Sequence, residues 1–317
     1  TVSPATLTFT SANYNSTQRV TVTGVNDSDI DGHVEYEISL SAADVLTDDP
    51  EVTTLAGSGS YGSTNGTGTS ASFYSPVGIT TDGTNLYVAD TDNHLIRKIV
   101  ISTGVVTTLA GSGTAGSADD DNGTAASFNK PYGITTDGTN LYVADRNNHL
   151  IRQIVISTGV VTTVAGTGSD GSVNGTGTLA SFYNPRGITT DGTNLYVAEY
   201  GNHLIRQIVI STGVVTTVAG TGSSGSVNDN GTAASFYAPT GITTDGTNLY
   251  VADGSNSLIR QIVISTGVVT TVAGTGSSGS SNGTGTAASF YIPTAITTDG
   301  TNLYVGDYGN SVIRQIE

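Results

Sequence analysis

The sequence contains no cysteine, methionine or tryptophan, and only 10 of its 317 residues are lysine or arginine. Without cysteine there is no disulfide framework, no thiolate nucleophile and no cysteine-ligated zinc. Asp and Glu number 26, and the resulting net charge of -16 argues against binding nucleic acid through phosphate contacts. No apolar run reaches the about 18 residues of a transmembrane helix, so we expect no membrane span. The chain begins at Thr1 without an initiator methionine, which indicates a processed chain or a fragment.

A repeat dominates most of the chain. The aspartate of a recurrent Ile-Thr-Thr-Asp-Gly string returns at spacings of 55, 54, 54 and 54 residues. Each unit holds four short β-branched runs, which in the first unit are residues 78–81, 86–89, 94–101 and 105–110. Third runs such as 150–156 are apolar on both alternating faces, so both faces of each sheet should be covered. This pattern predicts an all-β fold, a β-propeller of four-stranded blades.

The two ends of the repeat predict how the propeller closes. Residues 52–57 have the pattern of a fourth run, whereas the last unit ends after its third run. We therefore expect a closing strand at 52–57 that completes the final blade and removes two open sheet edges. The predicted propeller spans 52–317, follows a linker at 46–51, and has five blades starting near residues 78, 133, 187, 241 and 295.

The third run of each unit carries a resemblance to a known family. Its start reads Asn93-His94-Leu95 in the first unit, and Asn-His-Leu returns at 148–150 and 202–204. The flanking Pro-x-Gly-Ile, Leu-Tyr-Val-Ala-Asp and Ile-Arg positions match as well, so the chain resembles NHL-repeat propellers over about residues 52–317. The last two copies depart from the tripeptide, because Ser257 and Ser311 replace the histidine.

Residues 1–45 do not share the repeat. They predict three strands, at 5–10, 18–23 and 35–41, and resemble part of a Calx-β or immunoglobulin-like module. A sandwich of that kind needs about seven strands. Either the chain is cut from a longer protein, or a neighbouring molecule completes the sheet by strand addition, which would be a route to self-association.

Asp27, Asp29 and Asp31 followed by Gly32 have the spacing of a calcium-binding loop. Alternate carboxylates converge on one hard cation, and glycine permits the sharp turn between them. Ile38 stands where such a loop would end in glutamate, so a polar hairpin tip is the competing interpretation. We expect no other cofactor.

Two further sets of polar residues recur with the repeat. The histidines His94, His149 and His203 are expected to make a hydrogen bond within each blade. An arginine of the third run and an acid at the end of the second run are expected to form an ion pair in each blade. The arginines are Arg97, Arg152, Arg206, Arg260 and Arg314, and the acids are Asp90, Asp145, Glu199, Asp253 and Asp307.

A site for one ligand must lie where the copies differ. Because successive strands alternate in direction, the links from strand four to strand one and from strand two to strand three share one face. These links vary, whereas the Asp-Gly-Thr-Asn and Ser-Thr-Gly turns of the other face recur. A basic and aromatic patch is predicted there for a carboxylate, a sugar or an acidic peptide, with neutral drift as the alternative. Its candidate ligand-binding residues are Lys130, Tyr132, Arg146, Arg186, Tyr200 and Tyr308.

These features favour a non-enzymatic binding or structural module, extracellular or on the cell surface. Its expected ligand is a protein or a carbohydrate, and adhesion and filament or surface-layer building are both open. Because some NHL-like propellers are similar to amidating lyases or lactone hydrolases, an enzyme with an axial metal is the alternative. We find no unique set of His or acidic ligands for that metal, so we expect no catalytic residues. A signalling sensor would need a membrane anchor outside this chain.

Overall fold

The computed structural model describes residues 2–3, 21–22 and 52–317. The chain divides into two compact units, Thr1–Val52 and Thr53–Glu317. In the first unit, β1 (Val2–Ser3) pairs antiparallel with β2 (Thr21–Val22). The other residues on which the Calx-β resemblance and the linker at 46–51 were based lie outside the described residues.

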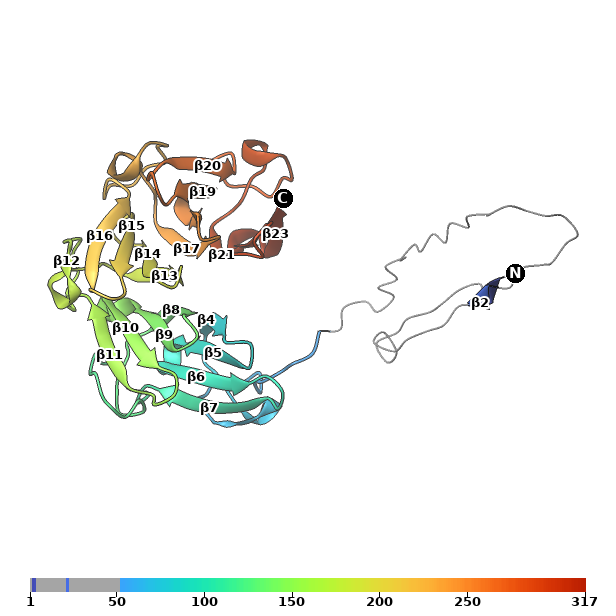
Figure 1. Cartoon of the computed structure of the whole chain (residues 1–317), viewed down its shortest axis with the longest axis vertical. Helices are drawn as coiled ribbons and strands as arrows, with labels where there is room; N and C mark the ends of the chain where they lie inside the picture. The colour runs from blue at the N-terminus through green and yellow to red at the C-terminus, as the bar shows by residue number, and fades with distance from the viewer. Residues whose placement is uncertain (1, 4–20, 23–51) are drawn as a thin grey trace, which may run out of the picture. The chain divides into compact units, whose positions relative to one another are not determined.

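The second unit is a five-bladed β-propeller, as the repeat predicts (Figure 1). Each blade is an antiparallel sheet in which consecutive strands pair in chain order. The strands of blade 1 are β4 (Pro76–Thr81), β5 (Asn85–Asp90), β6 (Leu95–Val100) and β7 (Val105–Ala110). Those of blade 2 are β8 (Pro131–Thr136), β9 (Asn140–Asp145), β10 (Leu150–Val155) and β11 (Val161–Ala165). Those of blade 3 are β13 (Pro185–Thr190), β14 (Asn194–Glu199), β15 (Leu204–Val209) and β16 (Val214–Ala219). Those of blade 4 are β17 (Pro239–Thr244), β18 (Asn248–Asp253), β19 (Leu258–Val263) and β20 (Val269–Ala273). Those of blade 5 are β21 (Pro293–Thr298), β22 (Leu303–Asp307) and β23 (Val312–Ile316).

The long links between blades run along the outer strands. In blade 1 the link forms β3 (Gly66–Thr67), which pairs with β7, and in blade 3 it forms β12 (Gly175–Thr176), which pairs with β16. Within residues 52–317 the helices are single 3₁₀ turns, which lie either in these links or after the second strands. They are η1 (Gly68–Ser70), η2 (Thr91–Asn93), η3 (Arg146–Asn148), η4 (Gly177–Leu179), η5 (Gly231–Ala233), η6 (Gly254–Asn256), η7 (Gly285–Ala287) and η8 (Tyr308–Asn310).

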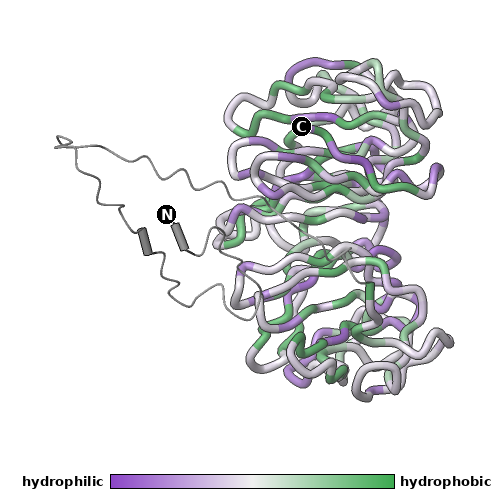
Figure 2. Tube along the Cα trace, turned by 90° about the vertical axis from the view of Figure 1, so that its right-hand side faces the viewer, coloured by the Kyte–Doolittle hydropathy of each residue, from purple (hydrophilic) through white to green (hydrophobic). Residues whose placement is uncertain are grey.

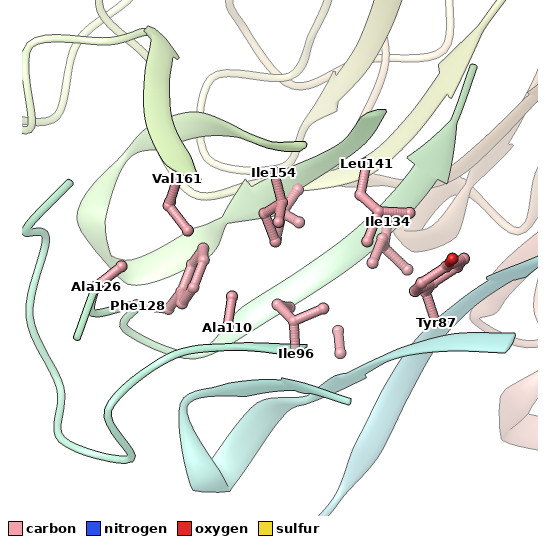
Figure 3. Close-up of a cluster of buried hydrophobic side chains, with 11 residues drawn as sticks. Tyr87, Ile96, Ala110, Ala126, Phe128, Ile134, Leu141, Ile154 and Val161 are labelled. Carbon is pink, nitrogen blue, oxygen red and sulfur yellow. The ribbon is translucent and has the colours of Figure 1, made fainter. Parts of the chain in front are cut away.

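The hydrophobic core lies between the blades, and hydrophobic stretches run through the stacked sheets (Figure 2). Figure 3 shows the cluster between blades 1 and 2, in which Tyr87 and Ile96 face Phe128, Ile134 and Ile154. Equivalent residues form the clusters between blades 2 and 3 and between blades 3 and 4. Both faces of the inner blades are thus covered, which explains why their third strands are almost continuously apolar.

The inner strands approach one another closely at a recurrent glycine. A Cβ atom added to Gly133 would overlap the carbonyl oxygen of Arg186 in the next blade, and Gly78 and Gly187 meet the following blade in the same way. A side chain at these positions would push the blades apart at the axis. Ala295 takes this place in β21, the last inner strand.

Each blade contains one recurrent ion pair, which we call the arginine clasp; it is buried in blades 1 to 4 and part-buried in blade 5. In blade 1, Arg97 on β6 donates from Nη1 to Asp90 Oδ2 at 2.9 Å, and both side chains are fully buried. Arg97 also donates to the carbonyl oxygen of Ser72 and to Asn65 Oδ1, and its guanidinium lies over the ring of Phe73. The predicted pairing of recurrent arginines and acids is confirmed, with N–O distances of 2.8 to 3.3 Å in the other four blades.

The asparagine of the tripeptide contributes to the arginine clasp. Asn93 donates from Nδ2 both to Asp90 Oδ2 and to the carbonyl oxygen of Gly62 in the link. It therefore ties the link to the acid of the clasp, and Asn256 and Asn310 do the same in blades 4 and 5. Leu95 is buried.

The predicted closing strand does not form. In the described residues, 52–57 make no strand, and the sheet of blade 5 contains only β21, β22 and β23. The backbone N–H of Gly57 instead donates to the carbonyl oxygen of Gly68 in the link of blade 1. In β21, Ala295 stands where the other inner strands have the glycine that lets the next inner strand approach, so its methyl group would hinder such an approach by β4.

Blades 1 and 5 consequently expose surfaces that are buried elsewhere. Ile79 in β4 is 60% exposed, whereas its equivalent Ile134 in β8 is 6% exposed. In β23, Ile313 is 76% exposed, whereas Ile151 in β10 is fully buried.

This difference predicts unequal costs for two equivalent substitutions. Ile134→Ala should lower the free energy of unfolding by about 2–5 kcal/mol, because it leaves a cavity between blades. Ile79→Ala should cost about 1 kcal/mol or less, because its side chain still faces solvent. Urea unfolding of both variants measures the two costs. Equal costs would show that the exposed face of blade 1 is covered in solution.

Candidate functional site

The variable face is the end of the propeller that carries the links from strand four to strand one and from strand two to strand three. Hydrogen bonds join these two kinds of link in each blade. In blade 1 the N–H of Asp92 donates to the carbonyl oxygen of Tyr74, and in blade 3 the N–H of Gly201 donates to that of Tyr183. The two links therefore form one surface within each blade, as the alternation of strand direction predicts.

Four of the predicted site residues come together on this face. The guanidinium carbon of Arg186 lies 3.5 Å from the ring centroid of Tyr200 and 5.4 Å from that of Tyr132. The guanidinium carbon of Arg146 lies 5.6 Å from the same Tyr132 ring. We call Tyr132, Arg146, Arg186 and Tyr200 the arginine–tyrosine cluster. Both guanidinium groups are within range of cation–π attraction to these rings.

Strand ends on two neighbouring blades hold this cluster. Tyr132 and Arg186 are the second residues of the inner strands β8 and β13, which pack together where Gly133 meets Arg186. Arg146 opens η3, directly after β9, and Tyr200 directly follows β14. The inner strands β8 and β13 thus place Tyr132 and Arg186 side by side, and the ends of β9 and β14 add Arg146 and Tyr200.

Charge and burial distinguish this cluster from the rest of the propeller. Neither Arg146 nor Arg186 pairs with a carboxylate among residues 52–317, whereas every clasp arginine does. Burial lowers the pKa of Arg186 from its ordinary value, and the nearby Arg146 lowers it further, while Tyr132 and Tyr200 act in the opposite direction. The cluster therefore concentrates positive charge on a chain whose net charge is -16.

The other predicted site residues lie elsewhere. Lys130 pairs with Asp92 of blade 1, with 3.0 Å between Nζ and Oδ1. Tyr308 belongs to blade 5, where it is 71% exposed and takes the place that Tyr200 has in blade 3. The calcium-ligand candidates Asp27, Asp29 and Asp31 lie outside the described residues.

The sequence reasoning missed a set of tyrosines on the variable face. Tyr74, Tyr183, Tyr237 and Tyr291 hold equivalent positions in four blades and are 40% to 45% exposed. The recurrent Phe-Tyr-x-Pro string before the first strand was the available signal, and Asn129 replaces the tyrosine in blade 2.

The histidines link neighbouring blades, so the prediction of a hydrogen bond within each blade was wrong. Nδ1 of His94 accepts the backbone N–H of Lys130 at 3.0 Å, across the junction of blades 1 and 2. Nδ1 of His149 accepts the N–H of Asn184, and Nδ1 of His203 accepts that of Ala238. These acceptors require neutral imidazoles, and burial lowers the pKa of all three histidines.

Residues 52–317 contain no group of three or more His, Cys, Asp or Glu side chains arranged to hold a metal ion. No helix that the structure describes is long and apolar enough to span a membrane.

Comparisons with known proteins support the NHL resemblance. No protein-family model matches the chain. It is 32% identical over 284 residues to the protein SUPPRESSOR OF QUENCHING 1, chloroplastic, of Arabidopsis thaliana, a match that covers 83% of this chain and 27% of that protein. It is 28% identical over 326 residues to NHL repeat-containing protein 2 of Gallus gallus, covering 90% of this chain and 44% of that protein. The chain thus spans less than half the length of these relatives.

A solved structure shows the same fold. A chain in the crystal structure of a nidogen/laminin complex superposes with a TM-score of 0.55 at 18% identity, over 77% of this chain and 76% of that one.

The histidine links predict a pH-dependent contribution to stability. Because the folded-state pKa lies below the unfolded value of about 6.5, the unfolded chain binds protons first as the pH falls. The contribution is therefore complete above pH 6.5 and is lost as the pH falls below it. At pH 7.5 the triple variant H94S/H149S/H203S should lose roughly 0.5–1.5 kcal/mol for each hydrogen bond removed.

Serine is a matched replacement, because Ser257 and Ser311 occupy this position in blades 4 and 5. Urea unfolding at pH 7.5 and pH 5 should show the gap between wild type and variant shrinking on acidification. Burial raises the pKa of Asp145 and Asp253 to about 6, but both proteins share these groups, so their effect cancels in the comparison. A gap that is the same at both pH values would contradict the prediction.

Proposed function

We propose that the propeller is a non-enzymatic binding and scaffold module that recognises a protein partner through its variable face. The observation that carries this proposal is the distribution, within residues 52–317, of tyrosine and of the two arginines that make no ion pair there. The tyrosines of residues 52–317 fall into two sets. One set points its hydroxyl groups at the aspartates of the recurrent turns on the opposite face, namely Tyr87, Tyr142, Tyr196, Tyr250 and Tyr304. The other set lies in or next to the links of the variable face, namely Tyr61, Tyr74, Tyr132, Tyr183, Tyr200, Tyr237, Tyr291 and Tyr308.

The second set has the chemistry of a protein-recognition surface. Tyrosine and arginine are enriched in interfaces. Tyrosine buries a large contact area at low cost in side-chain entropy, and arginine stacks on aromatic rings and donates several hydrogen bonds. Arg146 and Arg186 add guanidinium groups to the same face. A carbohydrate is the second ligand class that exposed tyrosine rings suit, and it belongs to this proposal as an alternative partner.

We also propose that the protein acts outside the cell or on a cell surface, as part of an adhesive or filamentous assembly. Its support is the resemblance of residues 1–45 to part of a Calx-β or immunoglobulin-like module, in which an incomplete sheet would join subunits by strand addition.

The test compares substitutions on the two faces. The variant Y74S/Y237S/Y291S removes exposed rings from the variable face, and S102A/S157A/S211A changes exposed turns of the opposite face. We expect wild-type protein and the serine-to-alanine control to capture the same partner from an extract of the source organism. The tyrosine variant should capture it at least about tenfold less, because interface aromatics supply much of the binding free energy.

Crosslinking followed by mass spectrometry then locates the partner, and thermal melting confirms that both variants are folded. Crosslinks to the recurrent Asp-Gly-Thr-Asn turns, or equal capture by the tyrosine variant, would reject the variable face as the binding surface.

A further inference from the structure

We propose that Arg146 and Arg186 form a subsite for a carboxylate group of an acidic peptide segment. The inference rests on the proposed function, since the segment would belong to the partner that the variable face recognises. It adds the chemical class of the group that is bound and the residues that bind it.

The first support is that the arginine side chains are already held in place. Arg186 is stacked on Tyr200 and lies beside Tyr132, which Arg146 approaches as well. Arg146 donates from Nε to Asn147 Oδ1 at 3.2 Å, which leaves its terminal nitrogens to point elsewhere. Side chains that are ordered before binding lose less entropy when the ligand arrives, so such an arrangement favours affinity.

The second support is the absence of a charge partner. In residues 52–317 each clasp arginine has a carboxylate at 2.8 to 3.3 Å, and Lys130 has Asp92. Arg146 and Arg186 have none in that part of the chain, although Arg186 is largely removed from water and its pKa is lowered by burial. A partly desolvated guanidinium gains more from an incoming anion than a fully hydrated one does.

The third support concerns the place of the two arginines in the propeller. Arg186 is the second residue of an inner strand, and the equivalent residues of the other blades are Val77, Tyr132, Thr240 and Thr294. None of these four carries a charge. Among these five positions the positive charge is therefore confined to Arg186, at the junction of blades 2 and 3, which suits one short anionic group.

The same confinement favours a carboxylate over a nucleic acid. A phosphate backbone is bound through several cationic contacts along its length, and two arginines on a strongly acidic chain do not form such a track. The planar guanidinium fork matches a carboxylate through two parallel N–H···O hydrogen bonds. A glutamate or aspartate side chain in an extended peptide meets both requirements.

The test uses pentaglutamate as the probe, with pentaglutamine as its uncharged counterpart and decathymidylate as the phosphate probe. Binding is followed by NMR of the arginine side-chain N–H groups in the full chain. We expect pentaglutamate to shift the signals of Arg146 and Arg186, with an affinity that falls as salt is raised. Pentaglutamine should shift neither signal.

Three variants assign the effect to the two arginines. R146Q/R186Q should weaken pentaglutamate binding at least about tenfold, since it removes both charge-assisted hydrogen-bond donors. R186K keeps the charge but loses the planar fork, and should weaken binding as well. K98Q removes one charge from a lysine that makes no ion pair in residues 52–317, and should leave binding unchanged.

Several outcomes would overturn the inference. One is no binding of pentaglutamate to wild-type protein, and another is equal binding by R146Q/R186Q in a protein whose thermal melting shows it folded. Stronger binding of decathymidylate through the same arginines would assign the site to phosphate instead. If R146Q/R186Q captures the partner normally while Y74S/Y237S/Y291S does not, the carboxylate subsite is wrong and the proposed function stands.

Discussion

The arginine clasp is the interaction on which the rest of the propeller depends. Removing one partner of a buried ion pair leaves an uncompensated buried charge and costs about 3–5 kcal/mol. In blade 1 the carboxylate of Asp90 accepts from Arg97, from Asn93 and from the backbone N–H of Tyr74. The clasp thus joins the second strand, the third strand and both links of the variable face, so the surface that carries the tyrosines is fixed by a buried charge pair.

The junctions between blades add a second constraint. Small residues lie where the inner strands meet, and a neutral histidine accepts a backbone N–H across each of the first three junctions. Gly133 allows β8 and β13 to approach until the carbonyl oxygen of Arg186 lies against it, and His149 receives a backbone N–H across the same junction. The arginine–tyrosine cluster lies at this junction. The packing of blades 2 and 3 therefore sets the geometry of the arginine–tyrosine cluster. This explains how residues about 54 positions apart in sequence form one site.

The sequence predicted the features that depend on recurrence and on strand direction. Its predictions were wrong where a feature depends on how closely two blades approach. Repeated acids and arginines predicted the clasp, and the alternation of strand direction predicted that Tyr132, Arg146, Arg186 and Tyr200 share one face. The local pattern of residues 52–57 is that of a fourth strand, but pairing with β23 also requires blades 1 and 5 to meet. Ala295, where the first four blades have glycine, was the signal against that junction.

The prediction for the histidines was wrong for a related reason. A repeat shows that a residue recurs, but it does not show whether the hydrogen-bond partner lies in the same blade or in the next. The same limit makes Arg146 and Arg186 informative, because they pair with no carboxylate in residues 52–317. A recurrent arginine is accounted for by a recurrent acid, so its charge is already neutralised in the fold. Arg146 and Arg186 occur once each in their positions, and they lie against the rings of Tyr132 and Tyr200. In a protein built from near-identical blades, the repeated fold does not require these two charges, and recognition is the role that we propose for them.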